Sequence, residues 1–506
     1  MNVPPAAGSL TDRSARAAQW RLAASLAGGV LQLASGILLA RLLAPVDFGV
    51  MALALVFHGL VQPLGDLGIG NAIVQRASLT ERHLRTAFTF SVLLGITVMA
   101  GLMLAAPAAA VIAREPAMTP VLRALAVSFA LGGPSVVARG LLRRALDFRR
   151  QFFIDIAAYV LGFGVVAVGL ALSGFGVWSL VWGSLVQSAF SSAAFFAALR
   201  HPLRALLAQP ELGELLRFGA GTAASSCVNF VALNGDNFVA GRWLGPASLG
   251  LYTRAYALMN VPHTYAASVV SSVLFPAFAQ VQGEPERLRR GYLLATQVTA
   301  MVAAPALATL AIAAPHLVPA LYGAQWIGAV PPLQILCVAG YFRALYHLGG
   351  AVAQSAGWVY HELWRQAAYA ALVIAGSLIG SRYGLAGIAT GVSVAIFFMY
   401  AATGQLALRV TGAPWRRYLR VQAGALATAA ATCAAALSIR VGLEEYGASS
   451  GIIAAAILAG ASIPWTLGFL WQLSGPDLDL LRSRLPGACA RPVERLRTLR
   501  GAQRRA

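Results

Sequence analysis

The chain contains little charge and no lysine. Charged residues make up 11% of its 506 residues, against about 25% in an ordinary soluble domain. All 38 basic residues are arginine, and only 18 residues are acidic. The hydrophobic fraction is 58% and the mean hydropathy is +0.70, which is more apolar sequence than a soluble core needs. This composition excludes an ordinary soluble protein and predicts an integral membrane protein.

Cysteine is also scarce, and motifs for metals and nucleotides are missing. The four cysteines lie far apart, with no CxxC pair and no histidine cluster beside them: Cys227, Cys337, Cys433 and Cys489. This pattern predicts neither a disulfide framework nor a metal site. The chain has no GxxxxGK[ST] motif, so no ATPase is built into it. We therefore expect no cofactor, no metal and no catalytic residues.

The excess of arginine gives a formal net charge of +20, which could suggest a nucleic-acid partner. The arginines, however, form short clusters between apolar blocks and do not make one continuous face. Such clusters set the orientation of membrane helices and contact anionic lipids. We expect membrane lipids as partners and no nucleic acid.

Apolar blocks recur along the whole chain, and each can cross the membrane core, which takes roughly 20 residues. The first block, residues 17–40, is too long for a cleavable signal peptide. The predicted fold class is an all-α integral membrane protein with about fourteen transmembrane helices. They are expected at residues 19–40, 48–68, 86–108, 120–140, 152–173, 176–199, 215–240, 248–275, 291–313, 328–353, 364–381, 384–408, 419–440 and 450–472.

The distribution of arginine predicts the orientation of these helices. With the N-terminus in the cytoplasm, 30 of the 38 arginines fall on cytoplasmic segments and six on external ones. The six external arginines are Arg41, Arg114, Arg123, Arg242, Arg382 and Arg440. Because cytoplasmic loops of membrane proteins carry the excess of positive charge, we expect both termini in the cytoplasm.

Two sequence echoes indicate an internal repeat. Residues 40–49 and 241–250 share arginine, leucine, proline and glycine at a constant offset of 201, each time at the turn between two helices. Residues 176–183 and 384–391 share glycines at an offset of 208. Six helices per repeat is an even number, so both copies have the same orientation. Parallel repeats of this kind occur in transporters that bind substrate between the two halves.

The repeat predicts the domain layout. We expect a cytoplasmic N-terminal segment, two six-helix lobes joined by a cytoplasmic linker and enclosing a central cavity, an appended helix pair, and a basic cytoplasmic tail. Their predicted ranges are 1–18, 19–199, 200–214, 215–408, 409–475 and 476–506. The arginine-rich tail is expected to lie on anionic lipid.

Several strings resemble one family of membrane proteins. The segments 38–49 and 66–75, LLARLLAPVDFG and DLGIGNAIVQ, resemble the opening of bacterial Wzx-type polysaccharide flippases. The later segment 236–245, DNFVAGRWLG, together with LGLY at 249–252, Pro262 and LFPA at 274–277, resembles the second half of the same family. The resemblance covers residues 15–410 and is specific to the family, not to a substrate.

This resemblance implies the multidrug/oligosaccharidyl-lipid/polysaccharide exporter fold. It also implies a flippase in the bacterial inner membrane that moves an undecaprenyl-diphosphate-linked oligosaccharide outward by alternating access. Exopolysaccharide, capsule or lipopolysaccharide O-antigen biosynthesis would use such a flippase, in possible contact with a polysaccharide polymerase or export machinery. Fold alone does not establish function, so the buried polar residues must suit this cargo.

Polar side chains within predicted helices supply the candidate substrate site. Ionisable groups there are costly and face a cavity or a partner. Arg254 and Arg343 are predicted to hold the diphosphate, because the planar guanidinium binds phosphate oxygens bidentately. Asp236, with its neighbours Asn234 and Asn237, could line the same cavity. Asp236 and Arg254 could instead form an ion pair that only fixes helix packing.

Three residues are candidates for coupling transport to an ion gradient: Asp66, Asp236 and His58. A buried carboxylate or a histidine can change its protonation during a transport cycle. Asp66 closes the second predicted helix, so it could equally be a turn or capping residue. His58 could equally be a packing residue. Asp155 follows Arg149 and Arg150, and we expect it to pair with them.

Three other functions compete with the flippase. A multidrug efflux antiporter should have an acidic or apolar cavity, whereas two arginines favour an anionic cargo. A lipid II flippase of the same superfamily would suit the same number of helices. A polysaccharide polymerase or glycosyltransferase needs external catalytic groups, yet the external loops are short, and their one acidic pair, Glu444–Glu445, lies in the last of them.

Overall fold

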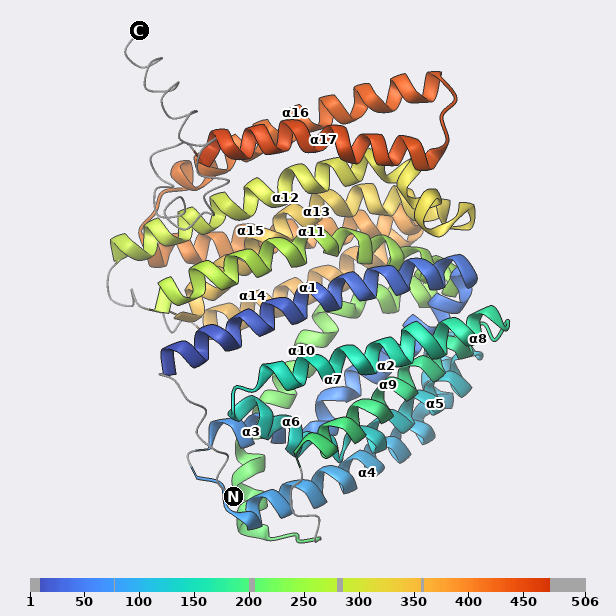
Figure 1. Ribbon diagram of the computed structural model, residues 1–506, viewed down its shortest axis with the longest axis vertical. Coiled ribbons are helices and arrows are strands. Elements are labelled where there is room, and N and C mark those ends of the chain that lie inside the picture. The colour runs from blue at the N-terminus through green and yellow to red at the C-terminus, as the bar shows by residue number, and fades with distance from the viewer. Residues whose placement is uncertain (1–9, 77, 200–204, 280–284, 356–358, 474–506) are drawn as a thin grey trace. The chain divides into compact units, whose positions relative to one another are not determined.

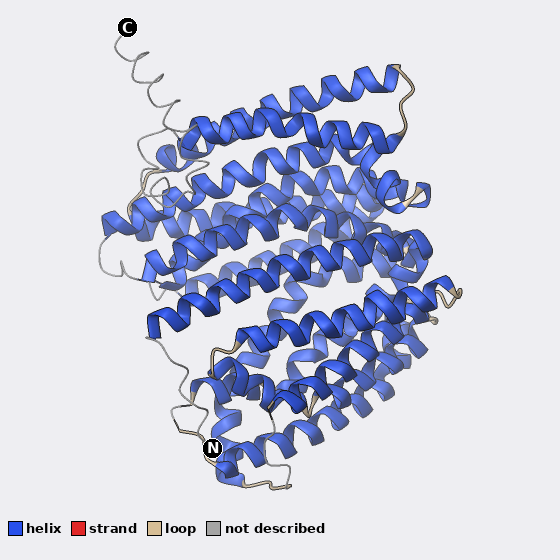
Figure 2. Ribbon diagram, viewed as in Figure 1, coloured by secondary structure: helices blue, strands red, loops and turns tan. Residues whose placement is uncertain are grey.

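The computed structural model describes residues 10–76, 78–199, 205–279, 285–355 and 359–473. Over these residues every regular element is a helix, and no strand is present (Figure 2). The chain divides into two compact units, Met1–Thr253 and Arg254–Ala506. This boundary falls inside a helix, α11 (Pro246–Ala279). The predicted division into lobes, linker and appended pair stays a prediction.

The first unit contains ten helices, one π-helical segment and the start of α11 (Figure 1). They are α1 (Leu10–Leu42), α2 (Pro45–Asp66), α3 (Ile69–Gln75), α4 (Glu81–Ala113), α5 (Met118–Gly132), α6 (Ser135–Arg144), α7 (Phe148–Tyr159), the π-helix η1 (Val160–Ala167), α8 (Val168–Leu172), α9 (Val177–Ala198) and α10 (Gln209–Leu244). Helices α7, η1 and α8 follow one another without a break in the chain, so the π-helix widens one long span.

The second unit contains the rest of α11 and six further helices, with two short 3₁₀ turns between them. They are α12 (Pro285–Tyr322), η2 (Ala324–Ala329), α13 (Val330–Ser355), α14 (Val359–Gly380), η3 (Ser381–Tyr383), α15 (Gly384–Thr411), α16 (Trp415–Glu445) and α17 (Ser450–Leu473). The last two form an adjacent pair that packs on α12.

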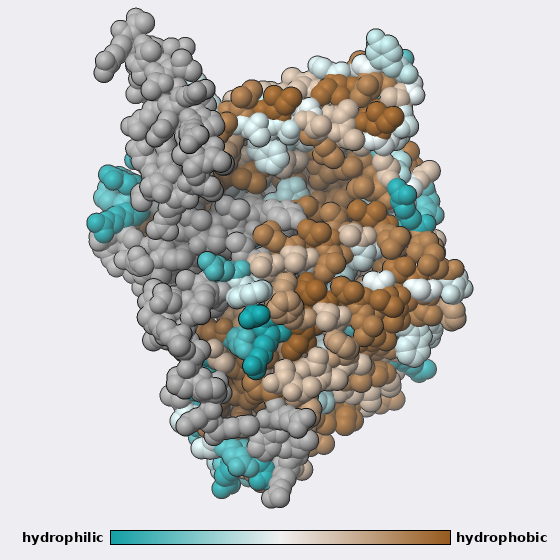
Figure 3. Space-filling model, viewed as in Figure 1, coloured by the Kyte–Doolittle hydropathy of each residue, from teal (hydrophilic) through white to brown (hydrophobic). Residues whose placement is uncertain are grey.

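The described helices have the length and surface of membrane spans. Ten of them are long and apolar enough to cross a bilayer, or eleven if the bent pair α5 and α6 is one span. Each of the fourteen predicted segments overlaps a helix, while the count of fourteen spans stays a prediction. Large apolar side chains such as Leu104 and Val111 are 82% and 77% exposed, and apolar residues cover most of the described surface in Figure 3. Such exposure is stable only against lipid.

The first sequence echo corresponds to a reciprocal contact between two helix starts, which we call the Pro–Gly crossing. Helices α2 and α11 begin at the repeated prolines, Pro45 and Pro246. A side chain at Gly49 would overlap the backbone carbonyl of Pro246, and one at Gly250 would overlap that of Pro45. The two helix starts therefore pack backbone against backbone, which only small residues permit.

The second echo also has one structural role in both copies. Gly183 on α9 packs against the backbone of Gly162 in η1, within the first unit. Its repeat partner Gly391, on α15, packs against the backbone of Gly376 on α14, within the second unit. In each unit a glycine pair thus lets two consecutive spans approach closely.

Replacing Gly49 by alanine should destabilise the protein because the new methyl group meets the Pro246 carbonyl. Overpacking of this kind costs about 1–3 kcal/mol. The melting temperature of purified Gly49→Ala in detergent should fall below that of the wild type, and Gly250→Ala should behave alike. Gly101→Ala is the matched control, because no atom lies within 4 Å of its added methyl group. Equal melting temperatures for Gly49→Ala and Gly101→Ala would contradict the crossing.

Candidate functional site

A polar cavity of about 690 Å³ lies among helices of the first unit. Most of its lining comes from α3, α6 and α7, so we call it the α3–α6–α7 cavity. Its lining residues are Ala24, Asn71, Val74, Gln75, Arg143, Leu146, Phe148, Gln151, Phe152 and Asp155. The volume lies in the range of ligand pockets, roughly 300–1,000 Å³.

Polar residues four positions apart carry the chemistry of this cavity. Asn71 and Gln75 share one face of α3, and Gln151 and Asp155 share one face of α7. Arg143 lines the cavity from α6, and Arg139, one turn earlier, interacts electrostatically with Asp155. Residues four apart lie on the same side of a helix. Helices α3, α6 and α7 therefore each present polar side chains on the side that faces the cavity.

Breaks between helices create the cavity. Helix α2 ends at Leu67 and Gly68, which both have positive φ angles of 42° and 70°, before α3 begins. Helix α6 ends before Leu146, which has a φ of 57° and lines the cavity. A left-handed leucine costs roughly 1–2 kcal/mol, and residues held in this region concentrate at functional sites.

Side-chain hydrogen bonds hold the broken ends in place. The Asp66 carboxylate accepts a hydrogen bond from the Gly70 N–H at 3.2 Å, which joins α2 to α3. The Arg144 guanidinium donates to the backbone carbonyls of Ile73, at 3.0 Å, and of Arg76. These carbonyls end α3, where a cation is favoured by the helix dipole. Asp66 thus acts as a turn residue beside the cavity.

The charges around the cavity balance. Two arginines, Arg139 and Arg143, interact electrostatically with two carboxylates, Asp66 and Asp155. The Arg139 guanidinium also donates to the Ser191 hydroxyl at 3.0 Å and lies over the Phe195 ring at 4.6 Å. The cluster is formally neutral, which limits the cost of placing its charges between membrane helices.

The partners of Asp155 differ from the sequence expectation. Arg150 forms an ion pair at 3.3 Å with Asp147, the residue that caps α7, and Asp155 interacts with Arg139 and Arg143 from the preceding helix. Positions 150 and 155 are five residues apart on one helix and therefore point about 140° away from each other. The expected pairing of Asp155 with Arg149 and Arg150 was wrong for this reason.

Asp236 lies in a second polar network of the first unit. Its carboxylate is 3% exposed and accepts hydrogen bonds from the Tyr252 hydroxyl at 2.8 Å and from the Asn237 N–H at 2.9 Å. The Asn237 side chain donates to that of Asn234 at 3.3 Å, and Asn234 donates to the Phe230 carbonyl at 3.1 Å. The structure therefore brings the three predicted residues of α10 together around a hydroxyl of α11.

The two predicted cavity arginines belong to the second unit. Arg254 is half-buried and interacts electrostatically with Tyr322 at the end of α12. The Arg343 guanidinium lies over the Tyr256 ring at 5.1 Å. Among the described residues, its Nε and Nη1 atoms are buried without a hydrogen-bond partner. Buried donors left unpaired cost about 1–3 kcal/mol, so an anionic oxygen would stabilise them.

His58 sits in the contact between α2 and α5. Its Nε2 atom lies 2.8 Å from the Ser128 hydroxyl, and its ring stacks on Phe129 with centroids 4.5 Å apart. This geometry suits a packing residue, and its role in ion coupling stays a prediction, as do those of Asp66 and Asp236.

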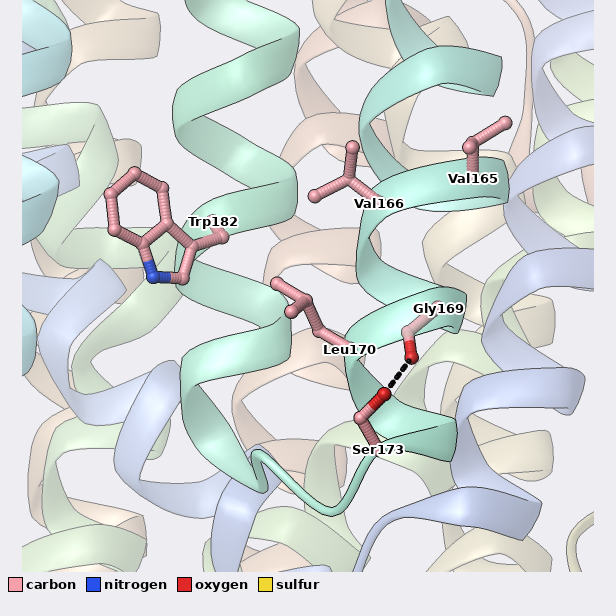
Figure 4. A pocket seen from close by; sticks show the side chains of 6 residues that line it. All are labelled: Val165, Val166, Gly169, Leu170, Ser173 and Trp182. Carbon is pink, nitrogen blue, oxygen red and sulfur yellow. Dashed lines mark hydrogen bonds between the residues drawn. The ribbon is translucent and has the colours of Figure 1, made fainter.

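An apolar pocket of about 480 Å³ lies between α9 and the η1–α8 segment. Figure 4 shows Trp182 on α9 and Val165, Val166 and Leu170 on the neighbouring η1–α8 segment, with the Ser173 hydroxyl donating a hydrogen bond to the Gly169 carbonyl. The pocket offers no charged group, so it suits hydrocarbon and not a phosphate or a sugar.

Sequence reasoning missed the α3–α6–α7 cavity. The signal was available, because Asn71/Gln75, Arg139/Arg143 and Gln151/Asp155 each repeat a polar residue at a spacing of four in helices with apolar neighbours. Arg139 and Arg143 were interpreted only as determinants of orientation. The meeting of the three pairs depends on the packing of α3, α6 and α7.

The fold is a multi-pass helical fold that is also found in solved transporters. The chain superposes on a lipid II flippase, MurJ, in an inward closed conformation, with a TM-score of 0.71 and 13% sequence identity over 88% of this chain and 97% of that one. It also superposes on an inward-facing multidrug resistance transporter of the MATE family, with a TM-score of 0.64 and 19% identity over 78% of this chain and 98% of that one.

Sequence comparison then identifies the family. A family model described as "Polysaccharide biosynthesis protein" matches residues 38–331. The lipopolysaccharide biosynthesis protein WzxC of Escherichia coli (strain K12) is 30% identical over 67% of this chain and 69% of its own length. The succinoglycan biosynthesis transport protein ExoT of Rhizobium meliloti (strain 1021) is 31% identical over 60% of this chain and 61% of its own length. The chain belongs to the polysaccharide biosynthesis protein family.

Replacing Tyr252 by phenylalanine should lower stability, because the buried Asp236 carboxylate loses a hydroxyl donor. The expected cost is about 1–3 kcal/mol, measured as a lower melting temperature in detergent. Tyr446→Phe is the matched control, since that side chain is 88% exposed. Asp236→Asn should make the Tyr252→Phe change less costly, because a neutral amide needs the hydroxyl less. Identical melting of both Tyr→Phe variants would contradict a structural role for the network.

Proposed function

We propose that the chain is a flippase for an undecaprenyl-diphosphate-linked oligosaccharide in the bacterial inner membrane. It would move this substrate from the cytoplasmic to the external leaflet by alternating access, for the biosynthesis of exopolysaccharide, capsule or lipopolysaccharide O-antigen. Both termini would lie in the cytoplasm, and the two six-helix repeats would form lobes around the transport path. A polysaccharide polymerase or export machinery would be its partner.

Membership of the polysaccharide biosynthesis family is the observation that carries this proposal. Relatives with 30% and 31% identity are named for lipopolysaccharide biosynthesis and for succinoglycan transport. The transporter fold supports a role in moving the substrate across the membrane. The fold alone would suit a drug or lipid II equally well, so the sequence relatives favour polysaccharide.

Arg343 is the side chain that we assign to the diphosphate, and Arg254 is the second candidate. The buried Nε and Nη1 atoms of Arg343 have no hydrogen-bond partner among the described residues, and each can donate a hydrogen bond to a phosphate oxygen. Tyr256 holds the guanidinium plane from one face, which leaves its edge for a ligand. Asn234, Asp236 and Asn237 stay candidates for the path, although the Asp236 carboxylate already accepts hydrogen bonds from Tyr252 and Asn237.

Deletion of the gene in its native host tests the function. Surface polysaccharide should disappear, and lipid-linked oligosaccharide should accumulate facing the cytoplasm, where a membrane-impermeant glycosidase cannot reach it in intact spheroplasts. The wild-type chain should restore export. Normal export by the deletion strain, with no second family member present, would overturn the proposal. Lost efflux of cationic drugs with normal polysaccharide would indicate a multidrug exporter.

Arg343→Ala should reduce export at least tenfold at equal membrane abundance, because the diphosphate loses a bidentate partner. Arg343→Lys should restore only part of the activity, since an ammonium group binds phosphate without the planar fork. Arg382→Ala is the matched control, because Arg382 is exposed on the short turn η3. Export by Arg343→Ala at the level of the control would remove Arg343 from the substrate site.

For Arg254 and Asp236, the single alanine variants and the charge-exchanged double variant should be compared in the same export assay. A functional Arg254 should leave both Arg254→Ala and the exchanged pair inactive, because the guanidinium is then missing from its position. Restored export by the exchanged pair would instead assign the two residues to a structural ion pair.

A further inference from the structure

We propose that the α3–α6–α7 cavity is a glycan subsite that binds the hydroxyl groups of a neutral sugar in the substrate. The inference rests on the proposed flippase function and adds a place where the sugar, and not the diphosphate, is recognised. It follows from the charge balance of the cavity, its amide groups, its aromatic rings and its accessibility.

The charge balance argues against an anion or a cation as the ligand. A diphosphate needs uncompensated positive charge, yet Asp66 and Asp155 offset Arg139 and Arg143. A metal cation needs several clustered acidic or imidazole ligands, and no such group of three exists among the described residues. A neutral ligand avoids both conflicts. It can also use the charged groups as strong hydrogen-bond partners.

The amide groups match the hydroxyls of a sugar. Asn71, Gln75 and Gln151 each offer two N–H donors and one carbonyl acceptor, and a sugar hydroxyl both donates and accepts. The Gln151 side chain lies one turn before Asp155 on α7 and interacts with its carboxylate. Its Oε1 atom is buried and has no hydrogen-bond partner within the described part of the chain. A ligand hydroxyl would donate a hydrogen bond to this oxygen.

Two aromatic rings complete the lining. Phe148 and Phe152 lie on the first two turns of α7 and border the cavity. Aromatic faces pack against the C–H faces of sugar rings, which are apolar although the rim of the ring is polar. Trp20 of α1 packs on Phe152 with ring centroids 5.7 Å apart. This contact restricts the orientation of the Phe152 ring.

The cavity is open to a ligand and lies at the predicted entry side. Asn71, Gln75 and Asp155 are exposed, and Arg143 and Gln151 are half-buried. The first turn of α7 carries Arg149, which lies over the Trp20 ring, and Arg150, which pairs with Asp147. The arginine distribution predicts that this end faces the cytoplasm, where a flippase substrate starts. The sugar site and Arg343 belong to different units, so different groups would recognise the glycan and the diphosphate.

Ligand-observed saturation-transfer NMR on the full chain in nanodiscs of neutral lipid tests this site. The probes are methyl α-glucopyranoside, methyl α-galactopyranoside, methyl α-mannopyranoside and N-acetylglucosamine. The wild type should bind at least one of them. Gln151→Leu and Asn71→Leu should each raise the Kd at least tenfold, because each removes an amide that hydrogen-bonds the sugar and tenfold in Kd is about 1.4 kcal/mol. Asn71 is exposed, so its variant tests the site even if Gln151→Leu folds poorly.

The control variant is Gln32→Leu, which changes an exposed glutamine on α1 outside the cavity lining. It should bind the glycoside as the wild type does. Inorganic pyrophosphate should not displace the glycoside. Displacement by pyrophosphate that depends on Arg143 would overturn the proposal in favour of an anion site. Absence of glycoside binding by the wild type would also overturn it.

The outcome is separable from that of the flippase assignment. If the deletion strain loses surface polysaccharide but the wild-type chain binds no glycoside, the glycan subsite is wrong and the flippase stands. If the deletion strain exports normally, the assignment of the chain as a flippase is wrong. The cavity then has no role as a glycan subsite of that transport path.

Discussion

The Pro–Gly crossing is the contact on which much of the first unit depends. Two helix starts, 201 residues apart, approach until the backbone of each meets the proline carbonyl of the other. Proline at the first position needs no N–H partner, and glycine four residues later removes the side chain that would keep the helices apart. In a bilayer, where apolar surface gains little from leaving lipid, such close packing is a main source of helix association.

Close packing by glycine recurs between one pair of consecutive spans in each unit. The pairs Gly162–Gly183 and Gly376–Gly391 bring neighbouring helices together in the two units. The two copies of the repeat therefore agree mainly at the positions where helices touch, and less at the other side chains. This explains why the echoes consist mainly of glycine and proline, which determine backbone geometry, while their neighbours vary between the copies.

Polar residues inside such a bundle need hydrogen-bond or charge partners, because burying them away from water costs free energy. The two polar networks obtain these partners differently. Asp236 is buried and receives a hydroxyl and a backbone donor, so its charge is satisfied within the protein. The α3–α6–α7 cavity balances two arginines against two carboxylates and leaves amide groups accessible. The first arrangement suits a structural role, and the second suits a ligand. The left-handed Leu146 lines this cavity and is held by the backbone hydrogen bonds that end α6, from the Leu146 N–H to Arg143 and from the Asp147 N–H to Leu142.

The sequence alone determined that the protein is a helical, multi-pass membrane protein, and it identified the family. Apolar blocks and their turns follow from local composition, so each predicted span overlaps a helix. The sequence also singled out Asp236 with its asparagines as one polar group, since these residues are neighbours on one helix. Tertiary structure decided what residues far apart in sequence do together. Asn71, Arg143 and Asp155 line one cavity. Asp155 interacts with Arg139 and Arg143. The backbone of Pro45 packs against Gly250. Helical periodicity gives the face on which a side chain lies, but only the packing of helices decides what that face meets.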